Sequence, residues 1–127
     1  MIPKFRAYDG GSLCRMYSPE EVMVGNGDIW IIDEDGVAGE WIVNNDLVLM
    51  QSTGLTDKDD KEIFEGDIVK MAKNVYSEPT YYEVVRHRGG VYRLESKQYG
   101  CELWLRHTDC EIAGNIYENP ELLEVSS

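Results

Sequence analysis

Short segments of strand-forming residues, separated by turn signals, fill most of the sequence between residues 28 and 117. Residues 28–33 place branched and aromatic side chains between acids and end near the turn signal Asp35-Gly36, before residues 37–43 resume the pattern. Short runs of strand formers on either side of a turn signal are typical of β-hairpins, so we expect one here. A chain patterned in this way favours sheets over a bundle of helices.

A second hairpin is predicted over residues 80–95. Residues 80–86 are rich in strand formers and precede His87-Arg88-Gly89-Gly90, whose glycines tolerate the positive φ that tight turns require. Residues 101–105 and 111–117 are further predicted strands. Because these strands are short and joined by turns, the pattern favours a small barrel or coiled antiparallel sheets.

The segment Leu49–Val69 leaves one apolar run, crosses a charged centre and returns to a second apolar run. Its centre, Asp57-Lys58-Asp59-Asp60, is predicted to be a solvated turn between two strands. An EF-hand loop starting at Asp57 needs Gly at its sixth position and Glu at its twelfth, and those positions hold Glu62 and Ile68. The sequence therefore argues against an EF-hand calcium site.

Signals for helix are confined to two short places. Ser18-Pro19-Glu20-Glu21 has the layout of a capping box, with Ser at the N-cap, Pro at the first helical position and Glu three residues after the cap. Asn119-Pro120-Glu121 repeats this logic near the C-terminus. Gly25-Asn26-Gly27 is followed by a predicted strand and not by a helix, so a plain turn is expected there and not a nucleotide-binding loop.

The length of 127 residues is typical of one domain, and 43% hydrophobic residues are enough for a core. We expect a single, mainly β domain over residues 1–127, with one or two short helical turns. Strongly apolar side chains never form a run near the roughly 20 residues of a membrane helix. With no visible secretory leader and an odd number of cysteines, three, a cytoplasmic protein without a membrane partner is expected.

The formal net charge of −12 repels phosphate backbones and disfavours broad nucleic-acid binding. Residues 70–107 differ, because seven Lys or Arg stand there against four Asp or Glu, a local charge of +3. Tyrosines interleave with these bases, and such a mixture can bind phosphates and stack bases. We favour the simpler interpretation, in which the tyrosines border the core. The nucleic-acid alternative predicts that Arg86, Arg88 and Arg93 cluster on one exposed face.

No catalytic residue is nominated, since the sequence contains neither a GxSxG nor a Walker motif. Cys101, His107 and Cys110, with His87 further away, are possible zinc ligands, but only His107 and Cys110 have the close spacing of a zinc knuckle. Cysteine is often a small buried hydrophobe, which we favour here. Neither a metal nor a cofactor is expected.

Three separated motifs occur in order along the chain. The first is Lys4-Phe5-Arg6-Ala7-Tyr8-Asp9. The second runs from Leu49 to Lys58 and continues through Glu65-Gly66-Asp67-Ile68-Val69. The third runs from Gly114 to Leu123. Together these motifs resemble the YopX protein family, small proteins encoded by bacteriophages and prophages. The turn of the second motif usually resembles D-K-N-G, whereas Asp60 stands here at the glycine position, so a more strained or differently shaped turn is expected.

The resemblance implies an intracellular, phage-derived protein with an all-β fold of coiled sheets, and it is compatible with a homo-oligomer. It implies no established activity, so no catalytic residue is carried over. Gly54 and Gly66 are expected in turns, and Phe5, Ile63 and Ile116 in the core. Our functional hypothesis is a non-enzymatic binding protein with an unidentified protein partner. The alternatives are a nucleic-acid-associated module or an acidic mimic of DNA.

Overall fold

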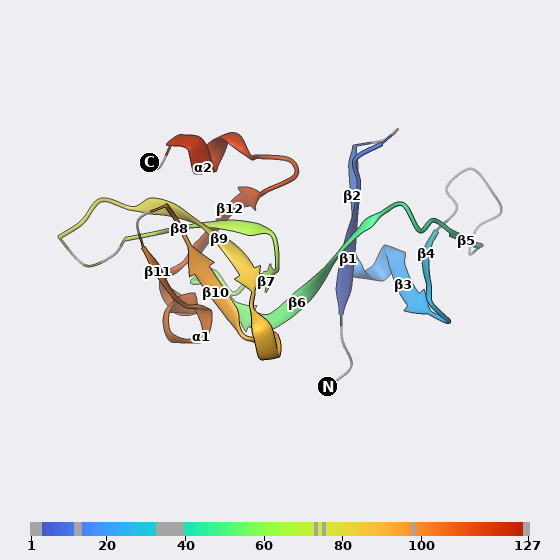
Figure 1. Cartoon of the computed structure of the whole chain (residues 1–127), viewed down its shortest axis with the longest axis horizontal. Helices are drawn as coiled ribbons and strands as arrows, with labels where there is room; N and C mark the ends of the chain where they lie inside the picture. Colours follow the sequence, from blue (N-terminus) through green and yellow to red (C-terminus); the bar gives the residue numbers. More distant parts are fainter. Residues whose placement is uncertain are drawn as a thin grey trace. The chain divides into compact units, whose positions relative to one another are not determined.

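The computed structural model describes residues 4–11, 14–32, 40–72, 74, 76–97 and 99–125. The chain divides into two compact units, Met1–Gln51 and Ser52–Ser127. Antiparallel strands dominate both units and the helices are short (Figure 1). The mainly β fold class is therefore confirmed. The organisation of residues 1–127 as a single domain stays a prediction.

The first unit contains two sets of paired strands. In one, β1 pairs on one side with β2 and on the other with the first half of β6. The other is a three-stranded antiparallel sheet in the order β3-β4-β5. The elements are β1 (Phe5–Asp9), β2 (Arg15–Tyr17), the 3-10 turn η1 (Pro19–Glu21), β3 (Val22–Gly25), β4 (Asp28–Ile32), β5 (Trp41–Val43) and β6 (Val48–Thr56).

Local signals in the first unit behave as the sequence predicts. The backbone N–H of Ser18 donates to the Glu21 carboxylate at 3.0 Å, so the predicted capping box opens η1. Between β3 and β4, Asn26 and Gly27 have φ of 53° and 80°, as a two-residue hairpin turn requires. The predicted pairing of β4 with β5 is confirmed, while its turn signal Asp35-Gly36 lies outside the described residues.

The core of the first unit is one cluster of apolar side chains. Its buried members are Ala7, Tyr17, Val22, Ile31 and Leu47, with Ile29 and Leu49 packed against them. Val22 and Ile31 are cross-strand partners in the three-stranded sheet, so this sheet turns one of its faces toward the cluster.

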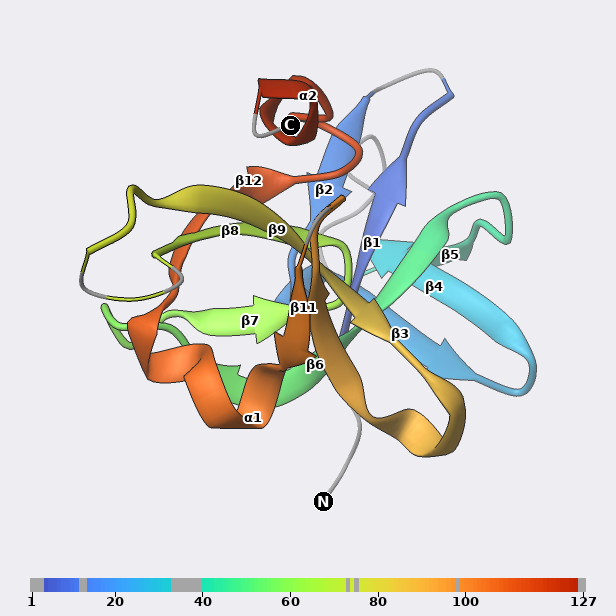
Figure 2. The same ribbon diagram turned by 60° about the vertical axis from the view of Figure 1, so that its left-hand side comes forward.

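The second unit is built on a five-stranded antiparallel sheet in the order β11-β10-β9-β8-β12. Its paired strands β8 and β9 lie side by side in Figure 2. The predicted hairpin over 80–95 is confirmed, because β9 pairs with β10 and Gly89 and Gly90 have positive φ. The elements after β6 are β7 (Glu62–Phe64), β8 (Asp67–Met71), β9 (Thr80–Arg86), the 3-10 turn η2 (Arg88–Gly90), β10 (Tyr92–Glu95), β11 (Gly100–Glu102), α1 (Leu103–Arg106), the 3-10 turn η3 (His107–Asp109), β12 (Glu111–Asn115) and α2 (Glu121–Val125).

The core of the second unit lies on one face of this sheet. Its buried members are Ile63, Val69, Met71, Tyr82, Val84, Leu94, Leu103 and Cys110. The expected core role of Ile63 is confirmed, whereas Phe5 and Ile116 are only partly buried.

The strand predicted over 101–105 is wrong beyond Glu102. The chain turns into α1 at Leu103, which is fully buried, while Trp104 and Leu105 remain 60% and 59% exposed. A strand would place Leu103 and Leu105 on one face, and the core holds only the first of them.

Two further details of the central segment correct the sequence-based account. Asp57 is not solvated but is buried at 3% exposure. Gly54 is not in a turn. It has φ of 78° inside β6, where the register with β7 shifts between Ser52 and Thr56. Asp60 has φ of 65°, as expected for a residue that replaces a turn glycine.

Candidate functional site

One face of the three-stranded sheet β3-β4-β5 is apolar without belonging to the core cluster of its unit. Cross-strand partners share a face, and the register aligns Met23, Trp30 and Val43 in one row and Ile32 with Trp41 in the next. Since side chains alternate along a strand, this face is opposite to the one that carries Val22 and Ile31. We call its apolar part the Trp30 face, which consists of Met23, Trp30, Ile32, Trp41 and Val43; Asp28 lies on the same side at the start of β4.

The Trp30 face is accessible to solvent. Met23 and Val43 are 48% and 44% exposed, and the three other side chains are partly exposed. The indole N–H of Trp30 donates to the Gly25 carbonyl oxygen at 3.4 Å, so the ring has a polar partner within its own hairpin. Contiguous apolar side chains in water are a common mark of interaction surfaces.

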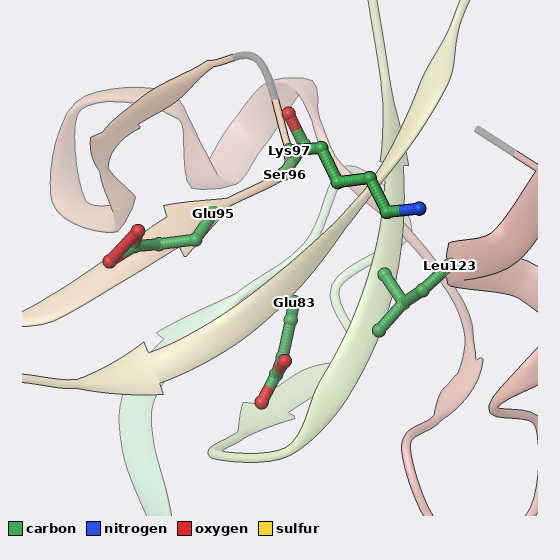
Figure 3. A pocket seen from close by; sticks show the side chains of 5 residues that line it. All are labelled: Glu83, Glu95, Ser96, Lys97 and Leu123. Atoms are coloured by element: carbon green, nitrogen blue, oxygen red, sulfur yellow. The ribbon is translucent and has the colours of Figure 1, made fainter. Parts of the chain in front are cut away.

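A second feature is a cavity of about 260 Å³ in the second unit. It is lined by Glu83 of β9, Glu95, Ser96 and Lys97 at the end of β10, and Leu123 of α2. Figure 3 shows Lys97 and Leu123 extending toward one another. In the register of β9 with β10, Glu83 and Glu95 stand directly opposite each other.

The two carboxylates of this cavity are not electrostatically equivalent. Burial, and secondarily the negative charge of Glu95, raise the pKa of Glu83. Glu95 has cationic or potentially cationic neighbours, because its Oε1 lies 2.6 Å from His87 Nε2 and 4.0 Å from Arg93 Nε. The described lining residues contribute neither a thiol nor an imidazole, and the Ser96 hydroxyl donates to the Tyr99 carbonyl oxygen at 3.1 Å.

The three arginines of the nucleic-acid alternative are not brought together on one face. Arg86 is the cross-strand partner of Tyr92 and hydrogen-bonds its hydroxyl, whereas Arg93 is the partner of Val85 on the opposite face of the sheet. Arg93 also lies near the carboxylates of Glu95 and Glu102, at 4.0 and 3.8 Å. Arg88 is exposed in η2.

Cys110, His107 and His87, three of the residues weighed as metal ligands, have other partners. Cys110 Sγ donates to the Arg106 carbonyl oxygen at 3.3 Å, and burial, as the largest cause, raises the pKa of its thiol to about 12. His107 Nδ1 lies 2.7 Å from the Thr56 carbonyl oxygen. Within the described residues, no group of three or more His, Cys, Asp or Glu is placed to hold a metal. Among those same residues, no helix is long and apolar enough to span a membrane.

Sequence reasoning did not single out the Trp30 face, although a signal for it was present. Residues 29–32 and 41–43 are unbroken apolar runs in short strands. In an antiparallel sheet with one solvated face, apolar and polar residues alternate. Unbroken runs therefore indicate that both faces of this sheet are apolar.

Comparison with known proteins identifies relatives over nearly the whole chain. The family model described as YopX protein matches residues 4–124. The chain is similar to the solved protein EF1440 from Enterococcus faecalis, with 30% identity, a TM-score of 0.63, and coverage of 97% of this chain and 99% of that one. It is also similar to the solved protein yopX from Bacillus subtilis, with 21% identity, a TM-score of 0.64, and coverage of 94% and 97%. No curated protein matches the chain.

Proposed function

Since the chain belongs to the YopX protein family, and its family motifs include buried core residues such as Ala7, Ile68 and Val69, we propose a function that resides on the surface of the protein. The proposed function is non-enzymatic binding of a partner protein through the Trp30 face. The single observation that carries it is the row Met23, Trp30 and Val43, three neighbouring apolar side chains on three adjacent strands, with Met23 and Val43 nearly half exposed.

The physical argument is the cost of leaving this surface in water. Each Å² of apolar surface removed from water contributes about 25 cal/mol, and Trp and Met are enriched in the desolvated centres of protein interfaces. Trp also dominates the few positions that contribute most of the binding free energy. A face with two tryptophans, a methionine and two branched aliphatic residues matches this composition.

The family resemblance supports the rest of the proposal, namely a phage- or prophage-derived protein that acts in the cytoplasm of a bacterial host. The formal net charge of −12 disfavours a homo-oligomer, because two copies repel each other. Nucleic-acid binding has less support, since Arg86 and Arg93 lie on opposite faces and Arg93 has carboxylate neighbours. Mimicry of DNA is consistent with the negative charge but does not explain the exposed apolar row Met23, Trp30 and Val43.

The proposal is tested by affinity capture with matched variants. Wild-type protein, the double variant Met23→Gln/Val43→Thr and the control Leu105→Gln are immobilised and exposed to lysates of Bacillus subtilis and Enterococcus faecalis. Leu105 is a suitable control because it is an exposed leucine of the second unit. We expect a protein that the wild type and the control retain and the double variant loses. If the double variant retains every protein that the wild type retains, the proposal is wrong.

A further inference from the structure

Strand β5 ends the strand order of its sheet, and the described residues place no further strand beside it. The backbone N–H of Asn44 donates to the Ile29 carbonyl oxygen at 2.8 Å. In an antiparallel ladder hydrogen-bonded and non-bonded pairs alternate, so the Ile42–Ile31 pair is also bonded and the Val43–Trp30 pair is not. The N–H and C=O groups of Trp41 and Val43 therefore point away from β4.

A free edge of this kind is a template for one more strand. Main-chain groups of an extended peptide pair with such an edge, and alternate side chains of the peptide then fall on the two faces of the sheet. Beside β5, every second side chain of an added strand extends the Trp30 face next to Val43 and Trp41. The free edge and the apolar Trp30 face thus select the same conformation of a ligand, an extended strand with apolar residues at alternate positions.

The stretch of sequence that contains β5 carries charge of one sign. The sequence from residue 16 to residue 57 contains no Lys, Arg or His. Glu40, which precedes β5, and Asp46, which follows it, are both exposed, and Asp28 on β4 is partly exposed. The acids of this stretch are Glu20, Glu21, Asp28, Asp33, Glu34, Asp35, Glu40, Asp46 and Asp57. A partner segment at β5 meets negative potential and no positive side chain from this stretch.

From this charge complementarity we infer that the occupant of the β5 edge is an extended, basic segment of the partner protein, which adds to the sheet as a fourth strand. The inference rests on the proposed function, because it specifies the kind of segment that the Trp30 face receives. A second copy of this chain is a poor occupant. It would bring another net charge of −12, and its own β5 would place Glu40 and Asp46 in the new pairing.

The test uses two soluble peptides with alternating residues, one of Lys and Val and one of Glu and Val, of equal length. Amide hydrogen exchange is followed by NMR with each peptide at low salt. We expect the Lys-Val peptide to slow exchange of the Trp41 and Val43 amides about tenfold or more, because these N–H groups gain acceptors. The Ile42 amide already points to Ile31 and should change little. The Glu-Val peptide should have no effect, and 1 M salt should weaken the Lys-Val effect.

A backbone variant isolates strand addition from the charge effect. Val43→Pro removes an outward N–H without removing a bond to β4, and Pro is tolerated on edge strands. It should abolish the Lys-Val effect at Trp41, whereas the control variant Val24→Thr, at an exposed valine on the opposite face of the sheet, should retain it. The wild-type exchange data alone remain decisive if the proline variant does not fold.

The inference is overturned if the two peptides act alike, or if the Lys-Val peptide leaves the Trp41 and Val43 amides unprotected. Protection that grows with protein concentration in the absence of peptide would identify a second copy as the occupant and also overturn it. A different outcome is that the Lys-Val peptide gives no amide protection while the variant Met23→Gln/Val43→Thr still fails to retain the protein that the wild type captures. In that case the proposed function stands and only the assignment of a basic strand is wrong.

Discussion

The Asp57 carboxylate accepts a hydrogen bond from the Ile112 backbone N–H at 3.0 Å, across 55 positions of the sequence. Its other oxygen accepts from the backbone N–H groups of Asp59 and Lys61, each at 2.9 Å. A single buried carboxylate thus closes the turn after β6 and holds it against β12. We therefore assign Asp57 a structural role in joining the central family motif to the C-terminal strand.

Asp57→Asn should destabilise the second unit by about 1–3 kcal/mol at pH 7, because an amide NH2 group faces backbone donors and leaves at least one of them unsatisfied. Burial alone would raise the pKa of Asp57, but the backbone hydrogen bonds, led by that of Ile112, outweigh it and lower the pKa. A lowered folded pKa gives stability that is present above the unfolded value, roughly 3.9, and is lost as the pH falls below it.

Urea unfolding at pH 7 and pH 3 measures this effect. The difference in the free energy of unfolding between wild type and Asp57→Asn should be smaller at pH 3 than at pH 7. The exposed control Asp59→Asn should have nearly the wild-type free energy of unfolding at either pH. An equal difference at both pH values would contradict the role of the ionised carboxylate.

Asp60→Gly should stabilise the protein by about 0.5–1 kcal/mol. Asp60 has φ of 65°, a conformation that costs energy for residues with a Cβ and little for glycine. The control Asp59→Gly should be neutral or destabilising, because Asp59 is not among the residues with positive φ and glycine adds freedom to the unfolded chain. Thermal unfolding of the two variants measures the sign of the stability change. A destabilised Asp60→Gly would show that the aspartate side chain stabilises the turn.

Glu83→Gln should stabilise the protein at neutral pH by about 0.2–1 kcal/mol, because like charges directly opposite on neighbouring strands destabilise a sheet. The pKa of Glu83 is raised in the folded state, so its protonated form favours folding. Stability is therefore greatest below the ordinary pKa of 4.5 and is lost as the pH rises through the raised value. The gain from the variant should vanish below that ordinary pKa. Thermal melting curves recorded from below pH 4.5 to neutral pH measure this dependence. A stability gain of Glu83→Gln that is independent of pH would contradict the role of the Glu83 charge.

Substitutions on the two faces of the β3-β4-β5 sheet should differ in their effect on stability. Met23→Gln should change the free energy of unfolding by no more than about 0.5 kcal/mol, because Met23 is 48% exposed. Ile31→Ala should cost about 2–5 kcal/mol, because Ile31 is buried at 4% exposure in the core cluster. Denaturant titrations compare the two. A large loss for Met23→Gln would show that the Trp30 face is structural.

Most of the fold follows from local sequence signals. The hairpin over 80–95 is predicted because Gly89 and Gly90 supply the positive φ that separates two strand-forming runs. The capping box at Ser18 depends only on residues within one turn of chain. Such features can be predicted from the sequence because the residues that cause them lie within a few positions of one another.

The features that sequence reasoning missed depend on distant partners. Nothing near Asp57 shows that the N–H of Ile112 comes to its carboxylate, so the turn looked solvated. The run from Leu103 to Leu105 suits a strand or a buried helix equally, and only the core of the finished sheet decides between them. Whether an apolar strand face is covered is likewise a property of the folded unit, which is why the Trp30 face emerged only from the register.

Photo-crosslinking in bacterial cells that express the protein tests the proposed binding function most directly. A photoreactive phenylalanine analogue replaces Val43 in one variant and Leu105 in the other, two exposed apolar positions in different units. The account predicts a discrete crosslinked protein from position 43 and none from position 105. The absence of any adduct at position 43, or the same adducts from both positions, would contradict the assignment of the Trp30 face as the contact surface.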